Sequence, residues 1–276
     1  MKYRDTGNDY SAVIPFLNGF DDDYLNALLQ GNKEGVEYLL RIVLKIPDLV
    51  ILKNPVTQQD LKNIYGKSIR MDCYAESIGK RFNVEIQRRN KGAGAHRARF
   101  NASLMDASFS VAGEDYDELP DTYVIFITEH DIYKAGKPYY VIERVIKTLG
   151  IDFCDGSHIL YVNGEYEGND PIGWLMHDLH CTNPHDMHEG PLKERALFLK
   201  ETKEGVRQMS DRIEKIRDEG VRIGEEKGRN HEKKTVAMKM IANGEPVNRI
   251  QDYTGLSSGE INSLKQKSRN NDSRSF

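Results

Sequence analysis

The sequence predicts an α/β fold, a mixed central sheet flanked by helices, followed by a charged helix and a small helical module. Amphipathic helical patterns precede a pair of alternating strand patterns, and a further helix and an apolar strand come after them. The length of 276 residues allows one substantial core with an appendage. We therefore expect a main domain over residues 1–194, a charged helical linker over 195–233, a helix-turn-helix-like module over 234–267 and a disordered tail over 268–276.

The first elements are two amphipathic helices. The aspartates at 21–23 are suited to cap the first helix, whose apolar positions recur at helical spacing over residues 25–29. The second helix covers residues 36–44, and Pro47 ends it because proline cannot continue a helix. The apolar run over residues 49–52 then predicts a short buried strand.

Two strand patterns, over residues 69–76 and 81–88, lie back to back in the chain. Each alternates apolar with polar residues, so each presents one polar face. The connection between them contains Gly79, which suits a tight hairpin turn. Pairing of Ser77 with Lys80 would then set the register of the hairpin.

That register brings two acids together. It places Asp72 directly opposite Glu85 and Arg70 opposite Gln87, and the Cβ atoms of such cross-strand pairs are about 4.5–5.5 Å apart. Two carboxylates this close repel each other unless a positive charge lies between them, and a divalent metal ion is the natural candidate. A polar hairpin face is also typical of ordinary solvated sheet, so the metal site needs further support.

Support comes from the charge of the surrounding segment. Residues 80–99 contain seven basic residues and the single acid Glu85, although the whole chain has a net charge of −4. Clustered Lys and Arg are typical of a surface that binds a phosphate backbone. The candidate DNA contacts are Arg88, Arg89, Lys91, Arg97 and Arg99.

Further elements of the main domain follow the hairpin. Glycines at 92 and 94 precede a predicted helix over residues 95–112. A nearly continuous apolar run over residues 122–127 predicts a central buried strand, and residues 139–142 and 159–162 predict two more strands.

Four histidines and a cysteine then lie within twelve residues, a spacing that superficially suggests zinc. Pro184 interrupts the run, and histidines separated by two residues do not share a helix face. The preferred interpretation is a helix that ends in a capped turn, with Asp178 and Asp186 making local hydrogen bonds. A zinc site is the alternative. The residues concerned are His177, His180, Cys181, His185 and His188.

Half of the residues from 195 to 234 are charged, with both signs interspersed, which favours a solvated linker helix. Residues 234–243, 246–253 and 260–266 predict three short helices that resemble a helix-turn-helix, able to enter a DNA groove or to act as an interaction cap. The alternative for the charged helix is a homodimer seam. Its apolar positions would be Val206, Met209, Ile213 and Ile216.

Composition limits the cellular setting. No stretch approaches the ~18 consecutive apolar residues of a membrane span, and the first residues lack the apolar core of a secretory signal. The odd number of cysteines (Cys73, Cys154 and Cys181) fits a reducing compartment. We therefore expect a cytoplasmic protein with no membrane partner.

The run from Asp72 to Glu85-Ile86-Gln87 resembles the active-site signature of the PD-(D/E)XK nucleases. More narrowly, it resembles the Rpn-type recombination-promoting nucleases, also described as PD-(D/E)XK family transposases, which carry phrases like lDv and vEmQ. The phrases here are RMDC and NVEIQ. Similar phrases (RARFNASLMD, TYVIFI and LMHDLHCTNPHDM) extend the resemblance over about residues 15 to 200.

The resemblance implies a restriction-endonuclease-like fold and metal-assisted phosphodiester hydrolysis. Asp72 and Glu85 would bind Mg²⁺ or Mn²⁺, and Gln87 would orient a water or contact the transition state. Most PD-(D/E)XK nucleases have Lys where this chain has Gln87; the glutamine amide can orient water but brings no charge, although Gln is usual in the Rpn-type group. A further acid often comes from the first helix of this superfamily, and Glu34 and Glu37 are candidates.

Three functions are therefore compatible with the sequence. The first is a Mg²⁺-dependent DNA endonuclease of the recombination-promoting or transposase-like type, with DNA as partner and no small-molecule cofactor. The second is a catalytically weak or inactive relative of the same fold that binds DNA or a partner. The third is a metalloprotein that uses the His/Cys cluster.

Overall fold

The computed structural model describes residues 10–63, 66–110, 113 and 115–272, and only the backbone at 90–91 and 267–272. The chain divides into two compact units, Met1–Ile213 and Glu214–Phe276. The long helix α6 (Lys203–Ala242) begins in the first unit and ends in the second. None of the helices within the described ranges has the length and apolar character needed to cross a membrane.

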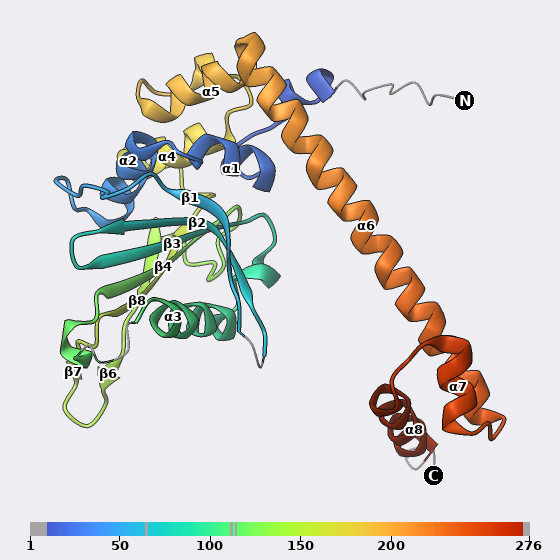
Figure 1. Ribbon diagram of the computed structural model, residues 1–276. Helices are drawn as coiled ribbons and strands as arrows, with labels where there is room; N and C mark the ends of the chain where they lie inside the picture. The colour runs from blue at the N-terminus through green and yellow to red at the C-terminus, as the bar shows by residue number, and fades with distance from the viewer. Residues whose placement is uncertain (1–9, 64–65, 111–112, 114, 273–276) are drawn as a thin grey trace. The chain divides into compact units, whose positions relative to one another are not determined.

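The first unit is built on a six-stranded mixed sheet with the strand order β1-β2-β3-β4-β8-β5 (Figure 1). An antiparallel meander, β1 to β3, leads into three parallel strands, β3, β4 and β8, and β5 runs antiparallel at the far edge. The carboxyl ends of β3, β4 and β8 therefore lie at one edge of the sheet. The strands are β1 (Val56–Leu61), β2 (Ile69–Ser77), β3 (Lys80–Gln87), β4 (Asp121–Thr128), β5 (Tyr139–Ile142) and β8 (Ser157–Asn163), with β6 (Val145–Ile146) and β7 (Ile151–Asp152) forming a separate hairpin.

Helices cover both faces of this sheet, and the predicted α/β fold is thereby confirmed. Figure 1 shows α3 on one face and α1, α2, α4 and α5 on the other. Alternation along β3 explains this arrangement, because Phe82, Val84 and Ile86 enter the core under α1 and α2, while Glu85 faces α3. The helices are α1 (Asp22–Leu29), α2 (Lys33–Leu44), α3 (Ala95–Phe109), α4 (Pro171–His180) and α5 (Pro191–Glu201).

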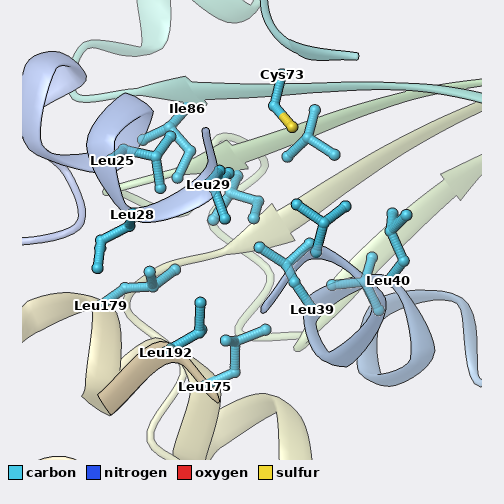
Figure 2. Close-up of a cluster of buried hydrophobic side chains, with 14 of the residues drawn as sticks. Leu25, Leu28, Leu29, Leu39, Leu40, Cys73, Ile86, Leu175, Leu179 and Leu192 are labelled. Atoms are coloured by element: carbon cyan, nitrogen blue, oxygen red, sulfur yellow. The ribbon is translucent and has the colours of Figure 1, made fainter. Parts of the chain in front are cut away.

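The larger hydrophobic core lies between the sheet and the helices α1, α2, α4 and α5. Figure 2 shows leucines of α1, α2, α4 and α5 meeting Cys73 and Ile86 of the sheet. The smaller core lies beneath α3 and contains Met71, Phe126 and Tyr161. Both cores exclude water from the strands that position the polar residues described below.

The strand predicted over residues 49–52 is wrong. Leu49 and Ile51 are buried as expected, but their segment is a loop. Side chains of α2 satisfy two of its backbone groups, since the Ile51 amide donates to Glu37 at 2.8 Å and Arg41 donates to the Leu49 carbonyl at 2.8 Å. A single backbone hydrogen bond, from the Leu52 amide to the Glu76 carbonyl at 2.8 Å, joins the segment to β2. An apolar run alone does not distinguish these two arrangements.

The predicted linker and dimer seam also differ from the structure. The first unit extends past residue 194 because α5 buries Leu192 and Leu199, and the start of α6 buries Met209 in the same core. Val206 and Ile213 pack against that core too. Three of the four residues predicted to form a homodimer seam are therefore used within the first unit.

The second unit contains the end of α6, α7 (Val247–Thr254) and α8 (Ser258–Asp272). These helices lie where the sequence predicts helices over residues 234–243, 246–253 and 260–266. Ala237, Ile250, Leu256 and Ile261 form its small core. The disordered tail predicted from residue 268 is wrong as far as Asp272, because α8 continues to that residue; residues 273–276 lie outside the described part of the chain.

Candidate active site

Glu85 occupies a buried position near the carboxyl end of β3. Its side chain is 0 % exposed and receives three hydrogen bonds. Arg97 Nη2 donates to Oε2 at 2.6 Å, while the amides of Asn83 and Asn101 donate to Oε1 at 3.0 and 3.4 Å. A buried carboxylate is tolerated only when it is paired and hydrogen-bonded in this way.

Asp72 lies where β2 separates from β3. The hairpin register runs from Ser77–Lys80 as predicted, but the last paired residues are Cys73 and Val84, one position before Asp72. The Asp72 carboxylate instead accepts a hydrogen bond from the Ile86 amide at 3.2 Å. Asp72 and Glu85 are therefore not paired through their backbones as predicted. The Asp72 side chain instead accepts the hydrogen bond that a backbone carbonyl of β2 would otherwise accept from Ile86.

A backbone kink explains this change. Met71 packs beneath α3 whereas Cys73 packs in the opposite core, although residues two apart on a regular strand share a face. Thr57–Cys73 and Gln59–Met71 pair between β1 and β2, and between them Gln58 has a left-handed φ of 56°. A non-glycine residue with positive φ is uncommon, and such local irregularities re-aim neighbouring side chains.

The two acids are electrostatically strained. Burial, followed by repulsion from Glu85 and Asp22, raises the pKa of Asp72 to about 7. Burial also raises the pKa of Glu85, although Arg97 and Asn83 oppose the rise. The site therefore holds acids whose ionisation at neutral pH is unfavourable without a nearby cation.

Asp22 is the third acid of this group, and it is not among the site residues predicted from the sequence. It is the first residue of α1, and its own pKa is raised by burial despite the attraction of Arg88 and Arg97. The candidates Glu34 and Glu37 lie elsewhere: Glu34 is exposed and Glu37 holds the loop after α2. The run of three aspartates at 21–23 was the available signal, which we interpreted only as a cap.

Gln87 and Arg97 adjoin the acids. Arg97 Nη1 lies 3.4 Å from Gln87 Oε1 and donates to the Gly92 carbonyl at 2.9 Å. A Cβ atom at Gly92 would lie 1.7 Å from Gln87 Oε1, so the glutamine occupies space that only a glycine leaves free. The positive charge that Gln87 lacks is therefore present beside it, supplied from α3.

The chain matches the sequence model described as PD-(D/E)XK nuclease family transposase over residues 23–164, just over half of its length. The chain belongs to this family. Membership supports a metal-dependent nuclease of transposase-like type, with DNA as its substrate, and confirms the resemblance drawn from the sequence. No curated protein and no solved structure matches the chain.

The family match includes Asp72, Glu85, Gln87 and Arg97 and begins one residue after Asp22. It ends before the histidine cluster of α4. The three acids do not bring three ligand atoms within 4.8 Å of one another, and Arg97 holds one oxygen of Glu85. Among the described residues, Arg97 is the nearest cation to Glu85.

The predicted DNA contacts divide into two kinds. Arg88 is paired with Asp21 at 2.9 Å and with Glu129 at 3.4 Å, so it joins α1 to the end of β4. Arg89 and Arg99 are exposed, and the side chain of Lys91 lies outside the described residues. Arg97, also predicted as a DNA contact, is engaged with the acids.

Proposed function

We propose that the chain is a DNA endonuclease that hydrolyses phosphodiester bonds with Mg²⁺ or Mn²⁺ bound by Asp72 and Glu85. The observation that carries the proposal is the placement of these two acids where β2 separates from β3, near the carboxyl end of β3. Glu85 is fully buried, and its charge contributes to the raised pKa of Asp72. A protein that keeps acids in such positions gains from a cation that neutralises them.

The donor chemistry fits a hard divalent ion. Asp72, Glu85 and Asp22 offer only carboxylate oxygens, which suit Mg²⁺ or Mn²⁺ better than a thiolate- or imidazole-preferring ion. When bound, such an ion lowers the pKa of a coordinated water and stabilises negative charge on the phosphate. Asp22 is placed to contribute charge to the same centre.

Gln87 and Arg97 perform the remaining tasks in this proposal. The Gln87 amide can accept a hydrogen bond from the attacking water or donate one to a phosphate oxygen. The guanidinium of Arg97 binds Glu85, and the same planar donor set recognises phosphate. Arg97 would therefore move from Glu85 toward the phosphate as the substrate binds, providing the positive charge that Gln87 does not bring.

Two exposed arginines extend this basic surface. Arg89 lies two residues after the end of β3, and Arg99 lies two residues after Arg97 on α3. We propose that they contact the DNA backbone, where each would contribute binding without sequence discrimination. Arg88 would instead act by positioning Asp21 and α1.

The proposal is tested by nicking of supercoiled plasmid with purified protein and Mg²⁺. Asp72→Asn and Glu85→Gln keep the shape of each side chain but remove its charge, so we expect cleavage to fall by about 10²–10³-fold or more. Asp60→Asn is the matched control, because Asp60 is an exposed acid on neighbouring β1 that pairs with Arg70. It should cleave like the unaltered protein.

Two outcomes would contradict the proposal. Equal cleavage by Asp72→Asn and Asp60→Asn would place the chemistry elsewhere. Absence of Mg²⁺-dependent cleavage in the unaltered protein, together with retained DNA binding, would favour the catalytically weak or inactive binding relative.

A further inference from the structure

A second cluster of metal-ligating side chains lies outside the nuclease centre. It consists of His177 and Asp178 near the end of α4 and His188 in the following loop. One ligand atom from each residue lies within 4.8 Å of the other two. Throughout the described ranges of the chain, no other three His, Cys, Asp or Glu residues meet this closely.

The cluster is organised by its acid. The Asp178 side chain is 2 % exposed, and its Oδ1 lies 2.8 Å from His188 Nδ1 and 3.2 Å from His177 Nδ1. The backbone amide of His188 donates to the same oxygen at 3.0 Å. Asp178 thus fixes a residue ten positions later in the chain and holds two imidazoles against one carboxylate.

These distances suit a metal ion. Zinc binds His nitrogen and carboxylate oxygen at about 2.0–2.2 Å, which separates two donors of a tetrahedral site by about 3.3 Å. The two distances from Asp178 Oδ1 are already near that value. Both imidazoles are about half-exposed, so small rotations can bring them together without disturbing the core.

Other histidines in the first unit do not share these features. His130, His158 and His185 each pair with a single glutamate, and those glutamates are 38–55 % exposed. Such pairs are typical of a solvated surface. Two imidazoles on one buried carboxylate form a different arrangement, with a donor set typical of a metal centre that retains an open position.

A cavity adjoins the cluster. It has a volume of about 750 Å³ and is lined by His177, His188 and Trp174, and by the segment that follows β8 from Gly164. Asp178 is not part of the lining, so the two imidazoles face the cavity while the acid anchors them from behind. An ion held by the three residues would have its remaining coordination position on the cavity side.

We propose that His177, Asp178 and His188 bind a borderline divalent transition-metal ion of the Zn²⁺ type. Imidazole nitrogen suits Zn²⁺, Co²⁺ and Ni²⁺, whereas Mg²⁺ prefers oxygen. The site would therefore select a different ion from the nuclease centre. The three ligands and the adjoining cavity match the open, three-ligand form of zinc site, with water or a small ligand in the fourth position.

The chain supplies its own reporter for this site. Its single tryptophan, Trp174, stacks on His188 with ring centroids 5.8 Å apart. Ions with unfilled d shells quench the fluorescence of a nearby indole, and Zn²⁺ does not. In tag-free full-length protein we expect Co²⁺ to quench Trp174 saturably, Zn²⁺ to reverse the quenching by competition, and Mg²⁺ to have no effect.

Three variants locate the site. His177→Ala and His188→Ala should each weaken Co²⁺ binding by at least about tenfold. His185→Ala is the matched control, since His185 is an exposed histidine of the same segment that pairs with Glu201, and it should bind Co²⁺ normally. Asp178→Asn tests the anchor, with thermal unfolding to confirm that the fold is retained.

The readout is independent of cleavage. Asp72→Asn should leave the quenching unchanged, so failure of the endonuclease proposal and failure of this one are distinguishable. Quenching that does not saturate, or that persists fully in both His177→Ala and His188→Ala, would show that Asp178 serves only as a hydrogen-bond acceptor and would overturn the metal site.

Discussion

Two centres at the carboxyl edge of the parallel strands differ in their donors. The proposed nuclease centre, which contains Asp72 and Glu85 near the end of β3, offers carboxylate oxygens with Arg97 among them. The histidine centre, beyond the end of β8, offers two imidazoles on one buried carboxylate. Strands β3 and β8 are separated only by β4, so one sheet edge presents two different ligand chemistries.

The difference shows how each centre deals with buried negative charge. Glu85 is neutralised by Arg97, which is 42 % exposed, whereas Asp178 accepts a hydrogen bond from the backbone amide of His188 and lies beside two imidazole rings. In the proposed mechanism, the first arrangement releases the Glu85 carboxylate when another cation binds. The second keeps its carboxylate in place with or without a metal. We therefore expect the nuclease centre to respond strongly to charge changes that leave the histidine centre unaffected.

Removal of Arg97 should produce the largest difference between the two centres, because it should reduce cleavage and leave the histidine centre unchanged. Arg97→Ala leaves Glu85 buried with only amide donors, so its pKa rises further and its ionised form becomes less favourable. We expect cleavage to fall about 100-fold. The free energy of unfolding should fall by about 1–3 kcal/mol, because the buried Glu85 carboxylate loses one of its partners. The loss is limited because the Arg97 side chain is itself partly exposed to solvent.

Arg99→Ala is the matched control for that variant. Arg99 lies on the same helix and is exposed, so its loss should change cleavage only a few-fold through weaker DNA binding. Quenching of Trp174 by Co²⁺ should be normal in both variants. Equal cleavage by Arg97→Ala and Arg99→Ala would show that Arg97 belongs to the DNA surface and not to the centre.

The pH dependence should be the next largest effect. The pKa of Asp72 is about 7 in the folded protein and about 3.9 in an unfolded chain, so between these values only the folded state keeps the proton. The free energy of unfolding of the metal-free protein should therefore fall as pH rises from about 4 to 7, by on the order of 2–4 kcal/mol, and then level off. Glu85 and Asp22 act in the same direction.

Metal binding should have the opposite dependence. Because a ligating carboxylate must lose its proton, affinity for Mg²⁺ should rise up to about tenfold per pH unit below pH 7 and be flat above it. Thermal unfolding with and without Mg²⁺ between pH 5 and 8 measures both effects. Asp72→Asn should reduce the slope of both profiles, leaving only the contribution of Glu85 and Asp22. An unaltered slope in that variant would assign the titration to another group.

Local patterns accounted for most of the fold and for part of the site. Alternation and a glycine turn define the β2–β3 hairpin and its register at Ser77, because both depend on neighbouring residues. The kink at Gln58 and Asp72 could not be predicted, since nothing in a glutamine indicates a left-handed φ. It is this kink that separates the two carboxylates from a regular cross-strand pair.

Contacts between segments far apart in the chain also could not be predicted from the sequence. Arg97 was predicted as a DNA contact from local charge, and its pairing with Glu85 depends on how α3 packs across the sheet. Histidines two residues apart do not share a helix face, so their spacing alone does not indicate a metal site. The loop after α4 returns His188 to Asp178, ten residues away, and no local spacing reveals that contact.

The smallest of the expected effects, at Gly92, isolates the role of Gln87. In Gly92→Ala the new methyl group would lie 1.7 Å from Gln87 Oε1, so the flexible glutamine must move away from Arg97 while the fold is kept. We expect cleavage to fall about tenfold. Gly94→Ala is the matched control, because a Cβ atom there meets nothing within 4 Å and the backbone is extended.

A double-variant cycle decides whether that loss acts through the glutamine. If displacement of Gln87 is the cause, Gly92→Ala should add almost nothing to Gln87→Ala, since the side chain that it displaces is already absent. Additive losses in cleavage would instead mean that the methyl group disturbs Arg97, whose guanidinium also contacts the Gly92 carbonyl. That result would assign the catalytic contribution at this edge to Arg97 and leave Gln87 as its packing neighbour.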